Sequence, residues 1–377
     1  LASMAFVLIA RDQLDRAFER DLQGIDAVVG AKGSPMQLVL SGVFHIDVPT
    51  GNIPLAEVKV LARHPMVAQV VPLSLGDNLH GFRIVGTTAG YLDLYGASLA
   101  RGALWTRPME AVLGAGVVKA SGLTVGQAFA GAHGLGSGGE QHGGSRYRVT
   151  GVLAPCGCVL DRLVLTSTES VWALHEEHEA EAHERSDLDV VSETGKGREI
   201  TMALVRYRSP VAAASFPREI NQRTGLQAAA PAVEVTRLLS MVGVGTRVLQ
   251  GLGTVWLGVA GLSVLVGLWS ALRERRHDLA MLRMLGASPA KVGALLLCEA
   301  LWLALLASVL GLLLAHGLTA IIGVGLAAQQ SLSVSGWQWV AAEAWVPVLA
   351  VGVALVAALV PVLGAYRMDV TPLLNSR

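Results

Sequence analysis

Charged residues are scarce in this chain of 377 residues: they make up 15% of the sequence, whereas soluble domains carry roughly 25%. Nearly all of them lie up to Arg247 or in a short cluster from Arg273 to Lys291. The 29 basic and 29 acidic residues balance, so no net positive field indicates nucleic acid. The shortage of charge indicates that part of the chain lies in lipid, and the balance argues against a nucleic-acid-binding protein.

Cysteine is also scarce, and 3 residues are too few for a disulfide framework. Cys156 and Cys158 are one residue apart, a spacing that rarely closes an unstrained disulfide. Free thiols, a metal or haem contact, a redox pair, a contact with another protein and an incidental turn all stay open for these two residues.

A nucleotide-binding loop is missing as well. No G-x-x-x-x-G-K-[ST] is present, and Gly195-Lys196 lacks the first glycine and the Ser/Thr. Residues 134–139 match G-x-G-x-x-G, but they lie in a glycine-rich loop that no predicted helix follows, so they predict no dinucleotide site. We also find no spacing that indicates a hydrolase. The chain is therefore not expected to be an enzyme by itself, and no catalytic residue or cofactor is predicted in it.

In place of charge the sequence has long apolar runs. Three are predicted to cross a membrane, at about 248–272, 292–324 and 345–366. The first carries no formal charge, and at ~1.5 Å per residue it exceeds the ~30 Å hydrocarbon core. Glu299 is taken as the one acid inside these runs, either a functional carboxylate or a residue near the headgroups. The apolar start, Leu1–Ala10, is interpreted as the outer end of a first transmembrane helix whose beginning is missing, or as an ordinary amphipathic helix.

Basic residues in short loops predict the orientation. The connection between the first two complete spans holds Arg273, Arg275, Arg276, Arg283 and Lys291, whereas the connection before Trp345 holds no Lys or Arg. The basic loop is therefore predicted to face the cytoplasm. Most of the chain before the first complete span is then outside, which in a diderm bacterium is the periplasm.

The segment 25–240 is predicted to be one extracytoplasmic α+β domain, between a stalk at 1–24 and a membrane domain at 241–377. Short β-like runs alternate with helical ones, and the length allows a substantial core. The predicted strands are Ala27–Gly30, Gln37–Ile46, Ala68–Leu73, Phe82–Gly86, Tyr147–Leu153 and Met202–Tyr207. The predicted helices are Leu55–His64, Glu110–Ser121, Glu169–Arg185 and Val211–Arg223.

The basic loop also carries a specific pattern. Arg275–Ser288 reads R-R-H-D-L-A-M-L-R-M-L-G-A-S, and it resembles the R-R-x-E-I-A-x-L-R-A-L-G-A-S signature of the FtsX-like permeases, the group of MacB, LolC/LolE, HrtB and FtsX. Asp278 stands for the usual Glu and Met284 for the usual Ala. Residues 26–34 resemble the start of the outer domain in LolC- and HrtB-like members, and the ending A-Y-R with P-L-L at 365–374 resembles that group's C-terminus.

The resemblance implies four transmembrane helices, a large periplasmic domain of the MacB type and a cytoplasmic coupling helix at about 276–290. It implies that a separate cytoplasmic ABC ATPase binds ATP and docks on that helix, and that a second permease copy completes a homodimer. The apolar and charged side chains of the predicted coupling helix suit such docking. The alternative is that this segment is only a basic loop that obeys the positive-inside rule and binds no partner. The expected coupling residues are Arg276, Asp278, Leu279, Leu282, Arg283, Leu285 and Gly286.

A run of histidines and glutamates in the outer domain is the candidate metal site. His175, His178, Glu179 and His183 fall on one side of a helix at about 100° per residue, and imidazole and carboxylate suit zinc. A weak zinc site is one interpretation and a solvated acidic helix is the other.

The expected function is that of an inner-membrane permease subunit that moves its periplasmic domain to export or extract an amphipathic or periplasmic substrate, together with lipid and a periplasmic adaptor or substrate protein. The alternatives are a metal or haem transport system and a regulator of a periplasmic partner that transports nothing.

Overall fold

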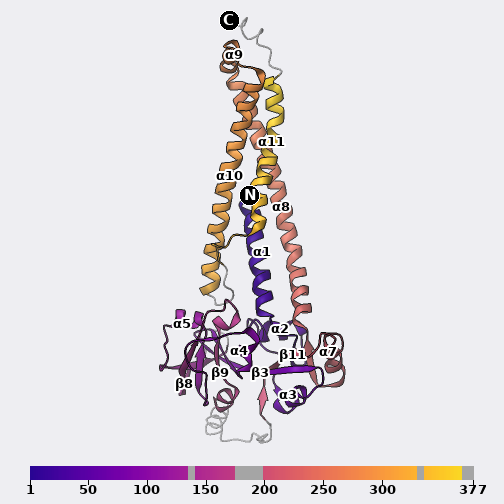
Figure 1. The fold of residues 1–377 in the computed structure, drawn as a ribbon, viewed down its shortest axis with the longest axis vertical. Helices are drawn as coiled ribbons and strands as arrows, with labels where there is room; N and C mark the ends of the chain where they lie inside the picture. The colour runs from indigo at the N-terminus through magenta and orange to yellow at the C-terminus, as the bar shows by residue number, and fades with distance from the viewer. Residues whose placement is uncertain (135–140, 175–197, 329–334, 367–377) are drawn as a thin grey trace, which may run out of the picture. The chain divides into compact units, whose positions relative to one another are not determined.

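The computed structural model describes residues 1–134, 141–174, 198–328 and 335–366. The chain divides into two compact units. The membrane unit consists of Leu1–Asp15 with Ser240–Arg377, and the outer domain consists of Arg16–Leu239. Figure 1 labels the elements of both.

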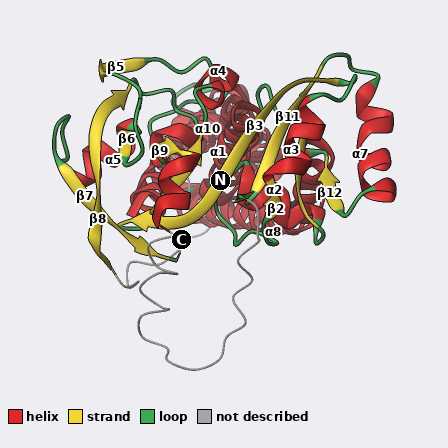
Figure 2. Ribbon diagram, turned by 90° about the horizontal axis from the view of Figure 1, so that it is seen from below, coloured by secondary structure: helices red, strands yellow, loops and turns green. Residues whose placement is uncertain are grey.

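The outer domain is a mixed α/β domain on one large twisted sheet (Figure 2). Its described strands are β1 (Ala27–Ala31), β2 (Ile53–Pro54), β3 (Val67–Leu79), β4 (Phe82–Thr87), β5 (Leu99–Gly102), β6 (Glu110–Leu113), β7 (Ala128–His133), β8 (Gln141–Leu153), β9 (Val164–Ser167), β10 (Glu199–Ile200), β11 (Met202–Tyr207) and β12 (Leu226–Ala229). Its described helices include α2 (Pro35–Gly42), α3 (Leu55–Ala62), α4 (Gly90–Tyr95), α5 (Ala115–Ser121), η1 (Val159–Arg162) and α7 (Ala212–Arg223).

The main sheet has the strand order β12-β1-β11-β3-β4-β9-β6-β8-β5, with β7 paired to β3 and β8. Its described pairs are antiparallel except β4 with β9 and β6 with β8. The short strands β2 and β10 form a separate pair.

Strand β3 is 13 residues long and serves two hydrophobic cores. Its first half pairs with β11, and Val67 packs with α3 and α7 in the first core. Its second half pairs with β4 and β7, and Leu79 packs in the second core, around Tyr147 and Leu113. One continuous strand, β3, therefore connects the two hydrophobic cores of the domain.

Two sequence predictions in this domain are wrong. Gln37–Ile46 was expected as a strand, but α2 occupies most of it because Ser34 caps the helix, accepting a hydrogen bond from the Gln37 amide at 3.4 Å, and Pro35 opens its first turn. Glu110–Ser121 was expected as one helix, but it is β6 followed by α5. Gly114, the N-cap of α5, has an extended backbone and separates the two elements. A side chain there would collide with the backbone carbonyl of Leu160, so the position requires glycine.

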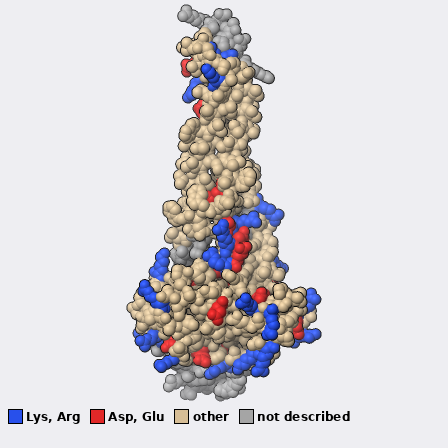
Figure 3. Space-filling view, viewed as in Figure 1, with Lys and Arg blue, Asp and Glu red and all other residues tan. Residues whose placement is uncertain are grey.

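The membrane unit is helical. Its described elements are the first part of α1 (Ala2–Asp21), α8 (Pro231–Glu274) from Ser240 onward, α9 (Arg276–Met284), α10 (Pro289–Ala328), η2 (Ala341–Ala344) and α11 (Trp345–Tyr366). Among the described residues, three segments are long and apolar enough to cross a membrane: Pro231–Glu274, Pro289–Gly325 and Ala341–Gly364. Most of the visible surface of these helices is uncharged (Figure 3). The predicted fold class, membrane helices with a large α+β domain, is confirmed.

Helices α10 and α11 pack along a row of small side chains. Ala300 and Ala304 lie against Ala350, Ala354 and Ala358 in one buried cluster. Small residues let helix backbones approach closely, which is how helices associate where lipid removes the hydrophobic driving force. The cluster therefore holds the two helices together as a close pair.

Candidate functional site

Helix α9 contains most of the sequence pattern singled out above. It has 9 residues and begins at Arg276, with Asp278 in its first turn near the positive end of the helix dipole. Its end is set by Gly286, which has φ 95°. The Gly286 amide donates to the Arg283 carbonyl at 3.1 Å and the Ala287 amide to the Leu282 carbonyl at 3.0 Å. These two bonds are the Schellman ending that glycine favours.

Leu279 anchors α9 to its own chain. Its side chain is only 4% exposed, and it packs with Leu272 of α8 and with Val292 and Leu296 of α10. The sequence assigned Leu279 to the face for a partner, whereas the structure turns it inward. It fixes the helix across the ends of two spanning helices.

The opposite side of α9 is apolar and exposed. Leu285 is 83% exposed, and Met281, Leu282 and Met284 are about half exposed. Asp278 is exposed and Arg283 is half-buried beside them. A short helix that is anchored on one side by Leu279 and exposes four large apolar side chains on the other has the arrangement of a docking element.

A second group of polar contacts ties the loop before α11 to α1 and α10. Gln13 of α1 binds the Ser335 backbone twice: its Nε2 donates to the carbonyl at 2.6 Å, and its Oε1 accepts from the amide at 2.8 Å. His316 of α10 has its Nδ1 2.7 Å from the Gly336 carbonyl and its Nε2 2.9 Å from Glu343 Oε2. We call these residues (Gln13, His316, Ser335, Gly336, Glu343) the polar clasp.

The polar clasp was not predicted from the sequence. Glu343 is only 2% exposed, and it lies just before the apolar run predicted at 345–366, within the candidate span Ala341–Gly364. The available signal was a histidine within one apolar run and a glutamate at the start of the next, since ionisable residues in such places are rare without a partner.

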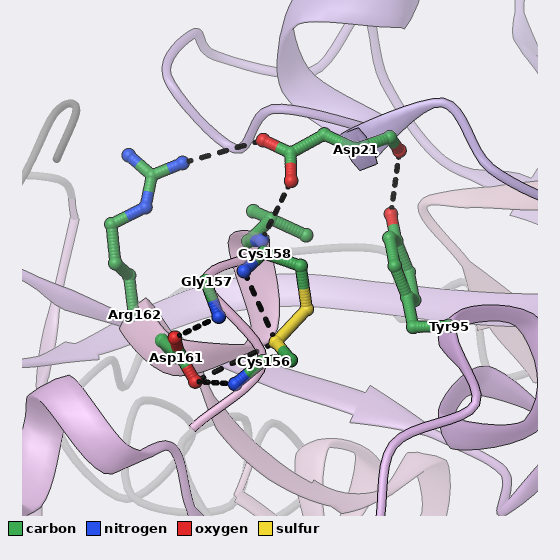
Figure 4. Close-up of a disulfide and its surroundings, with 8 residues drawn as sticks. Asp21, Tyr95, Cys156, Gly157, Cys158, Asp161 and Arg162 are labelled. Carbon is green, nitrogen blue, oxygen red and sulfur yellow. Dashed lines mark hydrogen bonds and ion pairs between the residues drawn. A yellow bond between two sulfur atoms is a disulfide. The ribbon is translucent and has the colours of Figure 1, made fainter. Parts of the chain in front are cut away.

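In the outer domain, the end of α1 is held by a buried carboxylate. Asp21 Oδ1 accepts a hydrogen bond from the Val159 amide at 2.8 Å, and its Oδ2 lies 3.9 Å from an Arg162 nitrogen. The Tyr95 hydroxyl donates to the Asp21 carbonyl at 2.9 Å (Figure 4). Burial raises the pKa of Asp21 to about 6, against the opposing effect of Arg162.

A buried histidine of the outer domain contacts Tyr91. His45 Nε2 is 2.9 Å from the Tyr91 hydroxyl, and its backbone has φ 55°. Burial, with the charge of Arg83 as a smaller cause, lowers the pKa of His45 well below its ordinary value. His45 is therefore a neutral hydrogen-bonding partner of Tyr91 rather than a charge.

Comparison with known proteins decides the family. The model of the MacB-like periplasmic core domain matches residues 1–223, and the model of the FtsX-like permease C-terminal region matches residues 251–370. The chain belongs to the FtsX/MacB-type ABC transporter permeases. It is thus a membrane protein with a periplasmic domain of the MacB type, and membership in this permease family implies a partner ABC ATPase.

Two solved structures resemble parts of this permease. The periplasmic region of MacB from Actinobacillus actinomycetemcomitans is 14% identical, covering 58% of this chain and 94% of that one, with a TM-score of 0.35. The extracellular domain of the noncanonic ABC-type transporter YknZ from Gram-positive bacteria is 14% identical, covering 54% of this chain and 98% of that one, with a TM-score of 0.31. No curated protein matches the chain.

The candidate metal ligands of the permease (His175, His178, Glu179 and His183) lie outside the described residues. Within the part of the chain that the structure describes, no three His, Cys, Asp or Glu residues gather as metal ligands. Cys156 and Cys158 are joined to each other in a disulfide, a pairing that is rare at this spacing. Gly157 permits the closure because it takes up φ 65° between the two cysteines.

Proposed function

We propose that this permease couples ATP hydrolysis by a separate cytoplasmic ATPase to movement of its outer domain. The observation that supports this most is the exposed apolar face of α9 (Met281, Leu282, Met284 and Leu285), held from behind by the buried Leu279. Burying such a face against a partner removes apolar surface from water, and its anchor passes a displacement to α8 and α10. We propose that α9 is the coupling helix, with Arg276, Asp278 and Arg283 supplying charge and Gly286 ending the helix.

The basic residues around α9 support its orientation. Arg273, Arg275, Arg283 and Lys291 lie in and beside α9, whereas the described residues between Ser335 and Ala344 include no Lys or Arg. Because cytoplasmic loops carry the excess of basic residues, we place α9 in the cytoplasm and the outer domain in the periplasm. The proposed location is the bacterial inner membrane.

The substrate class follows from the character of the helices. The three candidate spans are strongly apolar, and a path for a polar solute would need polar or ionisable side chains lining it. We therefore propose that the permease exports or extracts an amphipathic or periplasmic substrate, with a periplasmic adaptor or substrate protein and with membrane lipid around its helices.

A second permease copy is part of this proposal. Along α8 many large apolar side chains are exposed, among them Val248, Leu252, Val255, Leu262 and Val266. Lipid covers part of such a surface and a homodimer covers the rest.

The proposal is tested by co-purifying the permease with a cytoplasmic ABC ATPase subunit from the same organism. Leu282→Asp with Arg283→Glu places two acids on the docking face and is expected to abolish association. Val125→Asp is the matched control, because Val125 is a half-exposed apolar residue of the outer domain, and association should persist. Intact association with the double variant overturns the proposal.

One alternative substrate class rests on the His/Glu run at 175–184: a zinc or haem transport system. Elemental analysis of the purified permease tests it. Absence of bound zinc, with unchanged metal sensitivity after replacing His175, His178 and His183 by alanine, removes this alternative. A regulator that transports nothing is favoured instead if the gene neighbourhood pairs the permease with a cell-wall hydrolase.

A further inference from the structure

The loop Cys156-Gly157-Cys158 links β8 to η1 and carries a disulfide in the outer domain (Figure 4). Its two sulfurs differ in access. Cys158 is buried at 7% exposure, Cys156 is half-buried, and Gly157 between them is exposed. A soluble reagent therefore reaches the disulfide from the Cys156 side.

This disulfide adds little to global stability. In the chain-entropy account a disulfide stabilises a fold more the longer the loop that it closes, and here only one residue lies between the cysteines. The flanking backbone is already bonded: the Ala154 amide donates to the Ser98 carbonyl at 2.8 Å, and the Asp161 amide to the Cys158 carbonyl at 3.1 Å. The disulfide is thus better explained by its chemistry than by its contribution to stability.

The hydrogen bonds of Asp161 suit the loop both as a disulfide and as two thiols. Its Oδ1 accepts from the Cys156 amide at 3.0 Å and its Oδ2 from the Gly157 amide at 2.7 Å, so the carboxylate holds the backbone of the loop. The same Oδ1 lies 3.5 Å from Cys156 Sγ, and the Cys158 amide donates to that sulfur at 3.1 Å. A disulfide sulfur has no hydrogen to give to Asp161, whereas a thiol at Cys156 donates to Asp161 and accepts from Cys158.

The loop is also in direct contact with the last turn of α1. A Cβ atom at Gly157 would lie 2.5 Å from Arg20 Nη1, so the Arg20 guanidinium rests on the exposed glycine. On the other side, the Val159 amide donates to Asp21 at 2.8 Å, and Arg162 pairs with the same carboxylate. Gly157 therefore contacts the end of α1, and Val159 and Arg162, which follow the disulfide, bond to it. A change in the conformation of the loop would alter these contacts.

We propose that Cys156–Cys158 is a thiol–disulfide exchange site opened by a protein dithiol, and that its redox state sets how firmly the outer domain holds the end of α1. The site goes beyond the proposed transport function, since it involves neither α9 nor the ATPase. Exchange needs a thiolate that reaches one sulfur of a disulfide, and this loop offers such a sulfur at Cys156.

The exchange takes place in two steps. A thiolate of the partner dithiol attacks Cys156 Sγ, the Cys156–Cys158 bond breaks, and its electron pair leaves on Cys158 Sγ, which takes up a proton. The second partner thiolate then attacks the partner's own sulfur in the mixed disulfide and expels Cys156, which is protonated beside Asp161. The loop disulfide is reduced to two thiols, and the partner dithiol is oxidised to a disulfide.

The test uses the full chain in detergent with Cys298→Ser, because Cys298 is an exposed free thiol in α10 that would confuse the count. The probe is dithiothreitol, mixed with its oxidised form at defined ratios. We expect two maleimide additions to appear together by intact mass while circular dichroism stays native. Hydrogen exchange of the α1 segment 16–22 should rise at least ~3-fold in the reduced protein, since its holding contacts loosen.

Cys156→Ser is the second variant, because a serine hydroxyl can still donate to Asp161 while no disulfide forms. Its α1 exchange should equal that of the reduced protein and should not respond to dithiothreitol. A disulfide that resists reduction until the outer domain unfolds overturns the exchange site. Reduction without any change in the exchange of 16–22 overturns the link to α1.

Discussion

His316 Nε2 and Glu343 Oε2 lie 2.9 Å apart in a partly buried contact. The Gly336 carbonyl can only accept, so His316 Nδ1 carries a hydrogen. Glu343 Oε1 accepts from the Val340 amide at 2.9 Å, which leaves Oε2 facing His316 Nε2. Two lone pairs do not approach to this distance, so a proton lies between them, as an ion pair or as a neutral acid with a neutral imidazole.

This shared proton predicts different results for two substitutions of Glu343. Glu343→Gln can donate from its amide to His316 Nε2 and accept from Val340, so the polar clasp is retained. Glu343→Ala leaves the half-buried imidazole of His316 without its partner, at a cost of about 1–3 kcal/mol. Amide hydrogen exchange of 335–340 should therefore rise about tenfold in Glu343→Ala. Equal exchange in the two variants would show that the proton does not hold the contact.

Gln13 offers a graded test of the other half of the clasp. Its two hydrogen bonds to the Ser335 backbone join α1 to the loop before α11. Gln13→Glu can still accept from the Ser335 amide but can no longer donate to its carbonyl, while Gln13→Ala loses both bonds. Exchange at the Ser335 amide should be slowest in the wild type, intermediate in Gln13→Glu and fastest in Gln13→Ala, with roughly 1 kcal/mol per lost bond.

Asp21 predicts a pH dependence of stability. Its pKa is raised from 3.8 to about 6 by burial, so between these values the folded state binds more protons than the unfolded state. The contribution of Asp21 to the free energy of unfolding is therefore fully present below pH 4. It is lost as the pH rises through 6, by up to ~3 kcal/mol. Compared with Asp21→Asn, the wild-type melting temperature of the full chain should fall from pH 4 to pH 6. A parallel pH profile of the two proteins would contradict this assignment.

Gly286 predicts how the end of α9 contributes to docking. A Cβ there meets nothing within 4 Å, so only the backbone conformation matters. Gly286→Val puts a β-branched residue at φ 95°, at a cost of roughly 1–2 kcal/mol, and should weaken ATPase association about tenfold. Gly286→Asn is the control, because asparagine tolerates left-handed conformations. Its affinity for the ATPase should fall less than that of Gly286→Val. Unchanged association for Gly286→Val would separate the helix end from the docking face.

The sequence predicted what depends on composition and on long runs. Helices α8, α10 and α11 follow from apolar length alone, and β1, β4 and β11 follow from short apolar runs between turns. The interpretation of Gln37–Ile46 went wrong because its β-like residues outweighed the cap at Ser34, a signal that was present but not used. The inward direction of Leu279 could not be predicted, since it depends on where α8 and α10 end.

The polar contacts were even harder to predict from the sequence. Gln13 and Ser335 are 322 positions apart, and no pattern in the sequence connects an amide side chain with a distant backbone group. The same holds for Asp21 and Val159, which are 138 positions apart. Such contacts follow only from the packing of complete helices.

The length of β3 has a mechanical consequence for the outer domain. A load applied to the core around α3 and α7 is carried into the core around Tyr147 by covalent bonds of one strand, and not only by side chains that can slide. A flexible joint between the two cores would have to bend this strand and break its pairing with β11 or β4. The two cores of the outer domain are therefore expected to move together rather than as two hinged halves, because β3 runs through both.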